Sequence, residues 1–388
     1  MNEAPADEGE AAECVRAAKA PFDIAGAATR PFGRPGQAAL RLSTTRLTGI
    51  VFHEPAELLL RARAGTPVCE IEAALAAHNQ MLPFEPLDPR VLFESDGEPT
   101  VGGLVATALA GPRQLSAGAV RDNVLGLRLI TGRGEIVSTG KREMQNVAGL
   151  DLVKVTCGAL GTLGLITEAT FRIAPKPGAE ATVVIRRLDD AQGVAALTRA
   201  LGSPYGVSGA ALIHAGMGRD FPRTLLRVEG IAEAVSYRAE RLIALLADFG
   251  AKHALVDEDS NRMWRAIRDG AFLAEPRERA VWRARLKPGD AIAALASLGG
   301  TARASLLDHG GGRLWFSTDP TEAAAKAVRA ALARFPGHAE LIRAPAGLRA
   351  RVDVFAPLSP TLARITRGVK QALDPRGLFN PGRMYADI

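Results

Sequence analysis

The sequence predicts an α+β protein of two domains, and three observations lead to this prediction. The chain has 388 residues, which at about 150 residues per domain suggests more than one. Apolar residues make up 47% and charged residues 23%, as in ordinary globular proteins. The stretch Ala174-Pro175-Lys176-Pro177-Gly178 ends one pattern of elements and begins another. We therefore place a domain boundary there.

Short apolar strands, glycine turns and small helices alternate before this boundary. Glu54–Arg63 is predicted as a short helix, because Pro55 suits a first helical position and Glu57 suits the first turn. Gly132-Arg133-Gly134 is typical of a turn between two strands. The other elements expected in this part are a helix that follows Pro67 and ends at His78, and strands at Val124–Thr131, Glu135–Ser138 and Leu165–Ile173.

The part after the boundary has a β-α-β-β-α order, which is typical of a sheet covered by helices on one face. Its expected elements are Thr182–Leu188, Ala191–Leu201, Ser208–Ala215, Leu225–Gly230 and Ala232–Phe249, followed by a strand at Arg313–Ser317 and a helix at Pro320–Arg334. A last helix, Pro360–Leu373, should stop at Asp374-Pro375, because proline and the glycine that follows it do not continue a helix. We expect Trp264, Trp282 and Trp315 to be core residues rather than interface anchors.

The net charge of +6 suggests nucleic-acid binding only weakly. Most of the 48 basic residues are arginines spread along the chain with acids between them, and aromatic residues, which would stack on bases, make up 5%. No apolar run approaches the roughly 20 residues that cross a bilayer, and the acidic N-terminus lacks a signal pattern. We expect a cytoplasmic protein, with any attachment to the inner membrane made through partners.

Five glycine-containing clusters lie in the first 170 residues. None is a GxGxxG fingerprint after a strand or a Walker loop. Glycine lets backbone amides approach an anion closely, so clusters that recur in this way indicate a site for a large ligand that contains phosphates. The clusters are Ile24–Arg30, Thr100–Gly103, Ser116–Asp122, Asn146–Asp151 and Cys157–Gly164.

The order of these motifs resembles the FAD domain of vanillyl-alcohol-oxidase-type (p-cresol-methylhydroxylase-type, PCMH-type) flavoproteins. Val120–Gly126, Asn146-Val147-Ala148-Gly149 and Gly161–Glu168 carry this resemblance. Within that superfamily the chain is most similar to the family of FAD-binding subunits of bacterial glycolate oxidase, on the evidence of Met81–Pro86 and the tail Asp374–Tyr385. The similarity is dense over residues 22–177 and 373–388.

The resemblance implies a two-subdomain PCMH-type FAD-binding domain at 21–177 after an N-terminal arm at 1–20. It also implies an α+β cap or partner domain at 178–359, and a C-terminal helix and tail at 360–388 that pack back on the FAD-binding domain. FAD should be held without a covalent bond, since no His or Cys stands where relatives attach the flavin ring. The implied cofactor-binding residues are Ile24, Ala25, Gly26, Ala27, Ala28, Thr29, Arg30, Thr100, Gly102, Gly103, Ser116, Gly118, Arg121, Asp122, Gly158, Gly161, Gly164, Ile166 and Asn380.

This chain departs from the family pattern at a few of these positions. Ala27 and Ala28 follow Gly26, where relatives have further glycines, and Leu160 stands where the catalytic relatives have glutamate. The six histidines lack the spacing of metal ligands, so we expect no metal site. His309 and His214 are the most site-like, although a histidine without catalytic duty is the better interpretation of each. No residue is therefore assigned as catalytic.

We expect an FAD-binding subunit of a glycolate oxidase (glycolate dehydrogenase) complex that supports oxidation of glycolate to glyoxylate. The implied partners are a homologous FAD-containing catalytic subunit and an iron–sulfur subunit, because Cys14, Cys69 and Cys157 are too few and too scattered to hold a cluster here. One alternative is a stand-alone FAD-dependent 2-hydroxy acid dehydrogenase that uses His309 or His214 as base. Another is a structural subunit of the same complex that has lost its flavin.

Overall fold

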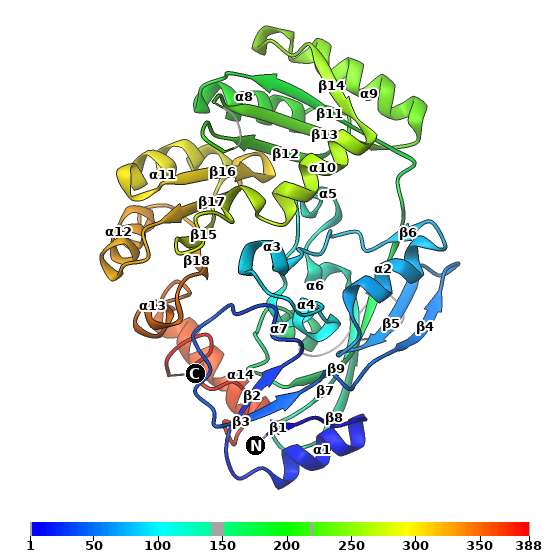
Figure 1. Cartoon of the computed structure of the whole chain (residues 1–388), viewed down its shortest axis with the longest axis vertical. Helices are drawn as coiled ribbons and strands as arrows, with labels where there is room; N and C mark the ends of the chain where they lie inside the picture. The colour runs from blue at the N-terminus through cyan, green and yellow to red at the C-terminus, as the bar shows by residue number, and fades with distance from the viewer. Residues whose placement is uncertain (1, 141–150, 218–219, 388) are drawn as a thin grey trace. The chain divides into compact units, whose positions relative to one another are not determined.

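A computed structural model describes residues 2–140, 151–217 and 220–387 of the chain (Figure 1). The motif Asn146–Gly149 lies outside the described residues. Contacts divide the chain into two compact units. The first unit comprises Met1–Ala110, Gly118–Lys176 and Pro357–Ile388, and the second comprises Gly111–Ala117 and Pro177–Ala356. The C-terminal segment therefore belongs to the same unit as the N-terminus.

The first unit contains a five-stranded antiparallel sheet of order β4-β5-β9-β7-β8. Its strands are β4 (Ile50–Glu54), β5 (Leu59–Arg63), β7 (Val124–Ile130), β8 (Ile136–Gly140) and β9 (Leu165–Arg172). A smaller parallel sheet of order β1-β3-β2 consists of β1 (Asn2–Glu3), β2 (Phe22–Ala25) and β3 (Leu40–Ser43). A short antiparallel pair is formed by β6 (Gln80–Met81) and β10 (Ala174–Pro175).

Helices pack on these sheets to give two cores within the first unit. The helices are α1 (Glu8–Ala17), α2 (Val68–Ala76), α3 (Pro89–Phe93), α4 (Val101–Thr107), α6 (Val120–Asn123), α7 (Leu152–Thr156) and α14 (Pro360–Leu373). One core joins α2 and α4 to the five-stranded sheet through residues such as Ile71, Leu104 and Phe171. The other joins α1 and β2 to Leu378 and Phe379 of the C-terminal tail. The first and last parts of the chain thus share a hydrophobic core.

The predicted helix at Glu54–Arg63 is wrong, because this segment is the end of β4, a turn and β5. Leu58 has a φ of 56°, which no α-helix accommodates. Leu60 and Ala62 then alternate into the core while their backbone pairs with β9. Pro55 and Glu57, which favour the start of a helix, lie in the turn instead. The hairpin over 124–138 and the helix Pro360–Leu373 are confirmed.

The second unit is built on one eight-stranded antiparallel sheet of order β14-β11-β13-β12-β16-β17-β15-β18. Its strands are β11 (Ala179–Arg186), β12 (Val207–Ile213), β13 (Arg223–Gly230), β14 (His253–Val256), β15 (Ala280–Arg285), β16 (Ala304–Asp308), β17 (Arg313–Thr318) and β18 (His338–Arg343). The α+β prediction is confirmed. Four of these strands, β14, β15, β16 and β18, were not predicted from the sequence.

Helices α8 and α9 pack on β11, β12 and β13, and α11 and α12 pack on β17 and β18 (Figure 1). The helices of this unit are α5 (Gln114–Ala117), α8 (Asp190–Leu201), α9 (Ala232–Leu245), α10 (Asp257–Arg268), α11 (Ala291–Leu298), α12 (Glu322–Leu332) and α13 (Ala346–Arg351). Short 3-10 turns lie at η1 (Ala247–Phe249), η2 (Ala271–Leu273), η3 (Pro288–Asp290), η4 (Gly299–Thr301) and η5 (His309–Gly311). The three tryptophans are buried, as predicted for core residues.

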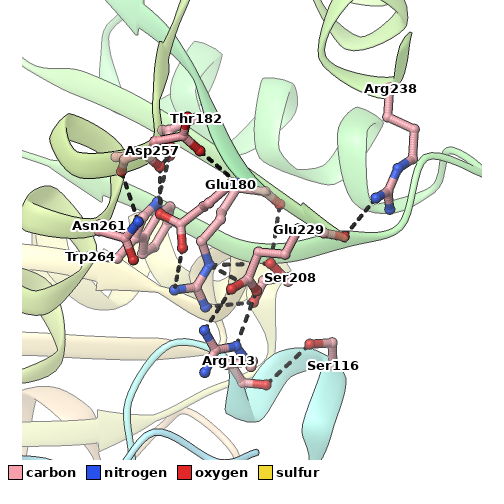
Figure 2. A network of polar contacts seen from close by, with 12 residues as sticks. Arg113, Ser116, Glu180, Thr182, Ser208, Glu229, Arg238, Asp257, Asn261 and Trp264 are labelled. Carbon is pink, nitrogen blue, oxygen red and sulfur yellow. Dashed lines mark hydrogen bonds and ion pairs between the residues drawn. The ribbon is translucent and has the colours of Figure 1, made fainter. Parts of the chain in front are cut away.

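A buried charge network holds the Gly111–Ala117 segment within the second unit (Figure 2). The Arg113 guanidinium donates to both carboxylate oxygens of Glu229, at 2.6 and 3.1 Å. Arg227 lies between Glu229 and Glu180, with its guanidinium over the Trp264 ring. Both acids are buried beside these two arginines, whose positive charges offset part of the desolvation cost of burying a carboxylate.

The two carboxylates of this network differ in their protonation. Burial raises the pKa of Glu180 to about 7, although Arg227 favours its charged form, and Ser260 donates to it at 2.6 Å. Burial also opposes ionisation of Glu229, yet Arg227 and Arg113 lower its pKa to about 2. The bidentate arginine therefore selects Glu229 as the charged member of the pair.

Glu180→Gln should abolish a pH dependence of stability between about pH 5 and 7. A glutamate in the unfolded chain ionises near pH 4.3, whereas Glu180 keeps its proton in the fold up to about 7. The wild type therefore loses unfolding free energy as the pH rises through this window, by up to about 1.4 kcal/mol per pH unit. Urea denaturation at several pH values measures the effect, with Glu233→Gln on the exposed start of α9 as the control. The same pH response in both variants would contradict it.

Candidate functional site

Two neighbouring cavities in the first unit, of about 230 and 70 Å³, lie where β2, α4 and the C-terminal tail meet. They share the lining residues Ile24, Gly26, Gly103, Ala106, Leu160 and Asn380. The segment that follows β2, from Gly26 to Phe32, lines the larger cavity without a break. The site is thus walled largely by backbone and small side chains, which suits a ligand that is bound by main-chain amides.

Gly26 is required at the start of this segment because the backbone there touches α4. A Cβ on Gly26 would lie 2.4 Å from the hydroxyl oxygen of Thr100. Thr100 is itself held in place as the N-cap of α4, where its side chain accepts a hydrogen bond from the Gly103 amide. A larger residue at Gly26 would push the loop away from α4 and so deform the cavity.

Three residues that line the larger cavity adopt positive φ without being glycine. They are Ala28 at 55°, Leu160 at 52° and Asn380 at 43°. Asparagine tolerates this region, whereas alanine and leucine each bear a steric cost of roughly 1–2 kcal/mol there. Strained backbone of this kind tends to gather at ligand sites, where the surrounding structure maintains it. Ala28, which stands where relatives have glycine, is therefore strained.

Arg30 brings a buried, incompletely bonded cation to the larger cavity. Arg30 is one of the residues that line the cavity, and it is 8% exposed. Nη2 donates to the Leu87 carbonyl at 3.1 Å, but Nε and Nη1 have no hydrogen-bond partner among the described residues. Burial lowers the pKa of Arg30 to about 10, so it remains charged at neutral pH. Buried donors without partners are costly, which indicates that an anion completes this site.

Further charges lie around Asp23, which also lines the larger cavity. Arg41 and Arg383 place guanidinium nitrogens 3.7 and 3.6 Å from its carboxylate oxygens. Arg383 also donates to the Phe32 carbonyl at 3.1 Å, and burial lowers its pKa. Asp23 and Arg41 were not predicted as site residues. In the sequence, both residues only continue the alternation of polar and apolar residues along β2 and β3. That alternation predicts strands but does not indicate that the two residues share a cavity.

Asn380 joins the tail to two walls of the site. Its Oδ1 accepts from the Ile24 amide and its Nδ2 donates to the Leu160 carbonyl, both at 2.7 Å. The residue is 4% exposed, and its own amide donates to the Phe22 carbonyl. The tail thus lies beside β2 and holds the loop that contains Leu160.

Most of the residues predicted from the sequence gather at these cavities. Those that line one or both are Ile24, Ala25, Gly26, Ala27, Ala28, Thr29, Arg30, Thr100, Gly102, Gly103, Gly161, Gly164, Ile166 and Asn380. The remaining five, Ser116, Gly118, Arg121, Asp122 and Gly158, line neither cavity. Ser116 lies in the second unit, where its hydroxyl donates to the Arg113 carbonyl. Arg121 and Asp122 are exposed and pair with each other at 4.0 Å.

Neither histidine considered from the sequence is placed to act as a base. His214 lines neither cavity; its Nδ1 bonds the Ser305 carbonyl at 2.6 Å, and its Nε2 lies 2.9 Å from the Asp190 carboxylate. Burial and the nearby Arg313 lower the pKa of His309 to about 2, so its ring is a very weak proton acceptor near neutral pH. The cavities themselves are lined by one carboxylate, Asp23, which is paired with arginines.

No three His, Cys, Asp or Glu side chains in the described part of the chain are grouped to hold a metal ion. Among the helices that the structure describes, none has the length and apolarity needed to cross a membrane.

The residues at the cavities fit a dinucleotide such as FAD. The unpaired Nε and Nη1 of Arg30 suit a phosphate, and the uninterrupted backbone from Gly26 to Phe32 offers amides beside them. The strained Ala28 makes the loop less adaptable than glycine would, but its side chain is small. Arg30 and the loop after β2 would hold the pyrophosphate, and Asn380 would border the same ligand.

Comparisons with known proteins agree with this geometry. Residues 3–140 match the FAD binding domain family. The chain is 34% identical to glycolate oxidase subunit GlcE of Escherichia coli K12, over 95% of this chain and 94% of that protein. It is 38% identical to glycolate oxidase subunit GlcD of Bacillus subtilis, but over 26% of this chain and 21% of that one. The solved structure of alkyldihydroxyacetonephosphate synthase superposes with a TM-score of 0.73 at 16% identity, covering 98% of this chain and 75% of that one, so the fold is shared.

Arg30→Met should weaken FAD binding by about 10- to 100-fold, because a charge-assisted hydrogen bond contributes roughly 1.5–3 kcal/mol. Methionine keeps the length and apolar stem of the side chain but removes the donors. Titration of the apoprotein with FAD, followed by flavin fluorescence, gives the dissociation constant. Arg46→Met is the control, since Arg46 is exposed, lines neither cavity and donates to the Ala4 carbonyl. Equal affinities for the two variants would rule out an anion contact by Arg30.

Ala28→Gly should stabilise the protein by about 0.5–1 kcal/mol, the relief of a left-handed alanine less the backbone entropy of glycine. Ala27 does not have positive φ, so Ala27→Gly should instead destabilise by a similar amount. Thermal or urea denaturation of the two variants measures both effects. Loss of stability in both would show that Ala28 is not strained.

Proposed function

Since the chain belongs to the family of glycolate oxidase subunit GlcE, we propose that it is the FAD-binding subunit of a glycolate oxidase (glycolate dehydrogenase) complex. Its cofactor is FAD, and it is an FAD-dependent oxidoreductase subunit acting on the CH–OH group of a 2-hydroxy acid. The observation that carries the proposal is the cavity after β2, which is lined by a continuous stretch of backbone and by Arg30, whose buried Nε and Nη1 have no hydrogen-bond partner among the described residues.

FAD, when bound, supplies the acceptor for the two electrons that leave a 2-hydroxy acid on oxidation. The residues of this chain hold and shield it. Arg30 would neutralise phosphate charge, Gly26 lets the loop lie against Thr100, and Leu160 presents an apolar side chain to both cavities. Among the described residues that line the cavities, Asp23 is the one carboxylate and it is paired with arginines, so we assign the chain a role in holding the flavin rather than in proton abstraction.

The catalytic step is proposed for a homologous FAD-containing subunit that oxidises glycolate to glyoxylate. The names of the relatives GlcE and GlcD, both glycolate oxidase subunits, support a multi-subunit assembly. An iron–sulfur subunit would carry electrons away, because the three cysteines of this chain are scattered single residues. We propose a cytoplasmic location, with any contact with the inner membrane made by partners.

The domain roles follow the same proposal. Residues 21–177 together with the helix and tail at 360–388 would form the FAD-binding part, and residues 178–359 the cap or partner part. The segment Gly111–Ala117 complicates this division, because its contacts lie with the second unit. The five predicted FAD contacts outside the two cavities also remain part of the proposal, and Arg121 and Asp122 among them are exposed.

The chain purified alone should take up FAD but oxidise glycolate, with an artificial dye as electron acceptor, at least about 100-fold more slowly than the complex. A missing general base costs roughly 10²–10⁴ in rate, and neither His214 nor His309 lines the cavities. The visible absorption spectrum reports bound flavin, and dye reduction reports turnover.

Each outcome of that experiment has a defined meaning. Turnover by the chain alone that approaches the rate of the complex would favour a stand-alone 2-hydroxy acid dehydrogenase. A colourless protein that fails to take up added FAD would favour a structural subunit without flavin. His309→Ala and His214→Ala are the matched variants, and neither should change the rate of the complex through proton transfer.

A further inference from the structure

The C-terminal tail is attached to the rest of the first unit by a buried ion pair, Lys370–Asp374. Asp374 has a side chain that is 0% exposed, and its carboxylate accepts hydrogen bonds from the Leu378 and Phe379 amides, both at 2.9 Å. The carboxylate therefore folds residues 375–379 into a tight loop. Gly132 packs against it so closely that a Cβ there would lie 2.2 Å from Oδ1.

Lys370, near the end of α14, completes this arrangement. Its ammonium group lies 2.7 Å from the Asp374 carboxylate, 2.7 Å from the Thr162 carbonyl and 2.9 Å from the Phe379 carbonyl. An ammonium has three N–H donors, and each has an acceptor here. One side chain thus ties together α14, the tail and the loop that contains Leu160 and Gly161.

This attachment affects the cavity through Phe379 and Asn380, the next residues of the tail. With Phe379 held, the tail forms a single parallel β-bridge to Phe22 of β2. Asn380 then follows directly and bonds both the Ile24 amide and the Leu160 carbonyl, two segments that line the cavities. The ion pair thus fixes the tail to α14 at Phe379, the residue directly before Asn380.

We infer that Lys370 and Asp374 are positioning residues, which hold the tail so that Asn380 closes the cofactor cavity. The inference rests on the proposed FAD-binding role but concerns residues that line neither cavity. It requires that loss of the pair weakens flavin binding beyond any effect on the fold. We call residues 370–380 the latch, because they connect α14 to the loop after β2.

The test compares Lys370→Met, Asp374→Asn and the double variant with the wild type, all as the full chain. Each single variant leaves a buried charge without its partner, so it should lower both stability and FAD affinity. The double variant leaves no charge unpaired, so its apoprotein should regain much of the lost stability. Its FAD affinity should remain at least about 10-fold below the wild type, because the bonds from Lys370 to the Phe379 and Thr162 carbonyls are still missing.

Arg367→Met is the matched control, because Arg367 also lies on α14 and pairs with the tail, at Asp387, but is exposed. It should leave FAD affinity within about 2-fold of the wild type. Recovery of FAD affinity in the double variant together with stability, or affinities no lower than that of Arg367→Met, would overturn the inference and reduce the pair to a purely structural role.

Amide hydrogen exchange of the apoprotein separates the latch from the proposed function. The Ile24 and Asn380 amides donate to Asn380 Oδ1 and to the Phe22 carbonyl, so both should be protected in the wild type and in Arg367→Met. Both should exchange faster in the double variant. If the wild type takes up no FAD, the proposed function fails, and the exchange rates alone decide whether the latch exists. Unchanged protection in the double variant would refute it.

Discussion

The side-chain amide of Asn380 is the contact on which the candidate site depends. One oxygen and one nitrogen, each at 2.7 Å from its partner, hold β2 and the Leu160 loop at a set separation. These segments are far apart in the sequence and belong to no common sheet, so few other contacts impose that spacing. The hydrophobic core under them, which includes Phe22, Leu165 and Phe379, supports the same arrangement from below. A cavity lined by strained and buried residues can persist because this frame is rigid.

Much of the site could be predicted from the sequence because its motifs are local. The loop Ile24–Arg30, the Gly102-Gly103 pair and Gly161 were identified from glycine patterns and a family resemblance, and all line the cavities. The contributions of Asp23, Arg41 and Lys370 could not be predicted, because they arise from strand pairing and from the return of the tail. The five predicted residues outside the cavities have the expected composition but lie on other surfaces.

The prediction of the fold from the sequence was limited in a similar way. The helix predicted at Glu54–Arg63 failed because local signals, Pro55 and Glu57, suit a turn as well as a helix, and pairing with β9 decided between them. The strands β15 and β18 were not predicted, and the charged Arg283, Arg285 and Glu340 within them do not indicate buried strands. In the fold, Arg283 and Glu340 are buried as an ion pair. A charged side chain can lie in a core when an opposite charge neutralises it. A single sequence does not reveal which residue supplies that opposite charge.

The two units thus use buried charge differently. In the second unit Arg113, Arg227, Glu180 and Glu229 satisfy one another, which makes the cluster structural. In the first unit Arg30 is left with donors that no described residue meets, and we therefore propose it as the contact for an external anion. The most direct test is a crystal structure of the chain with FAD bound. The pyrophosphate should lie within hydrogen-bonding distance of Arg30 Nη1 and of the backbone after Gly26. A pyrophosphate bound elsewhere, with Arg30 still unpaired, would contradict the assignment.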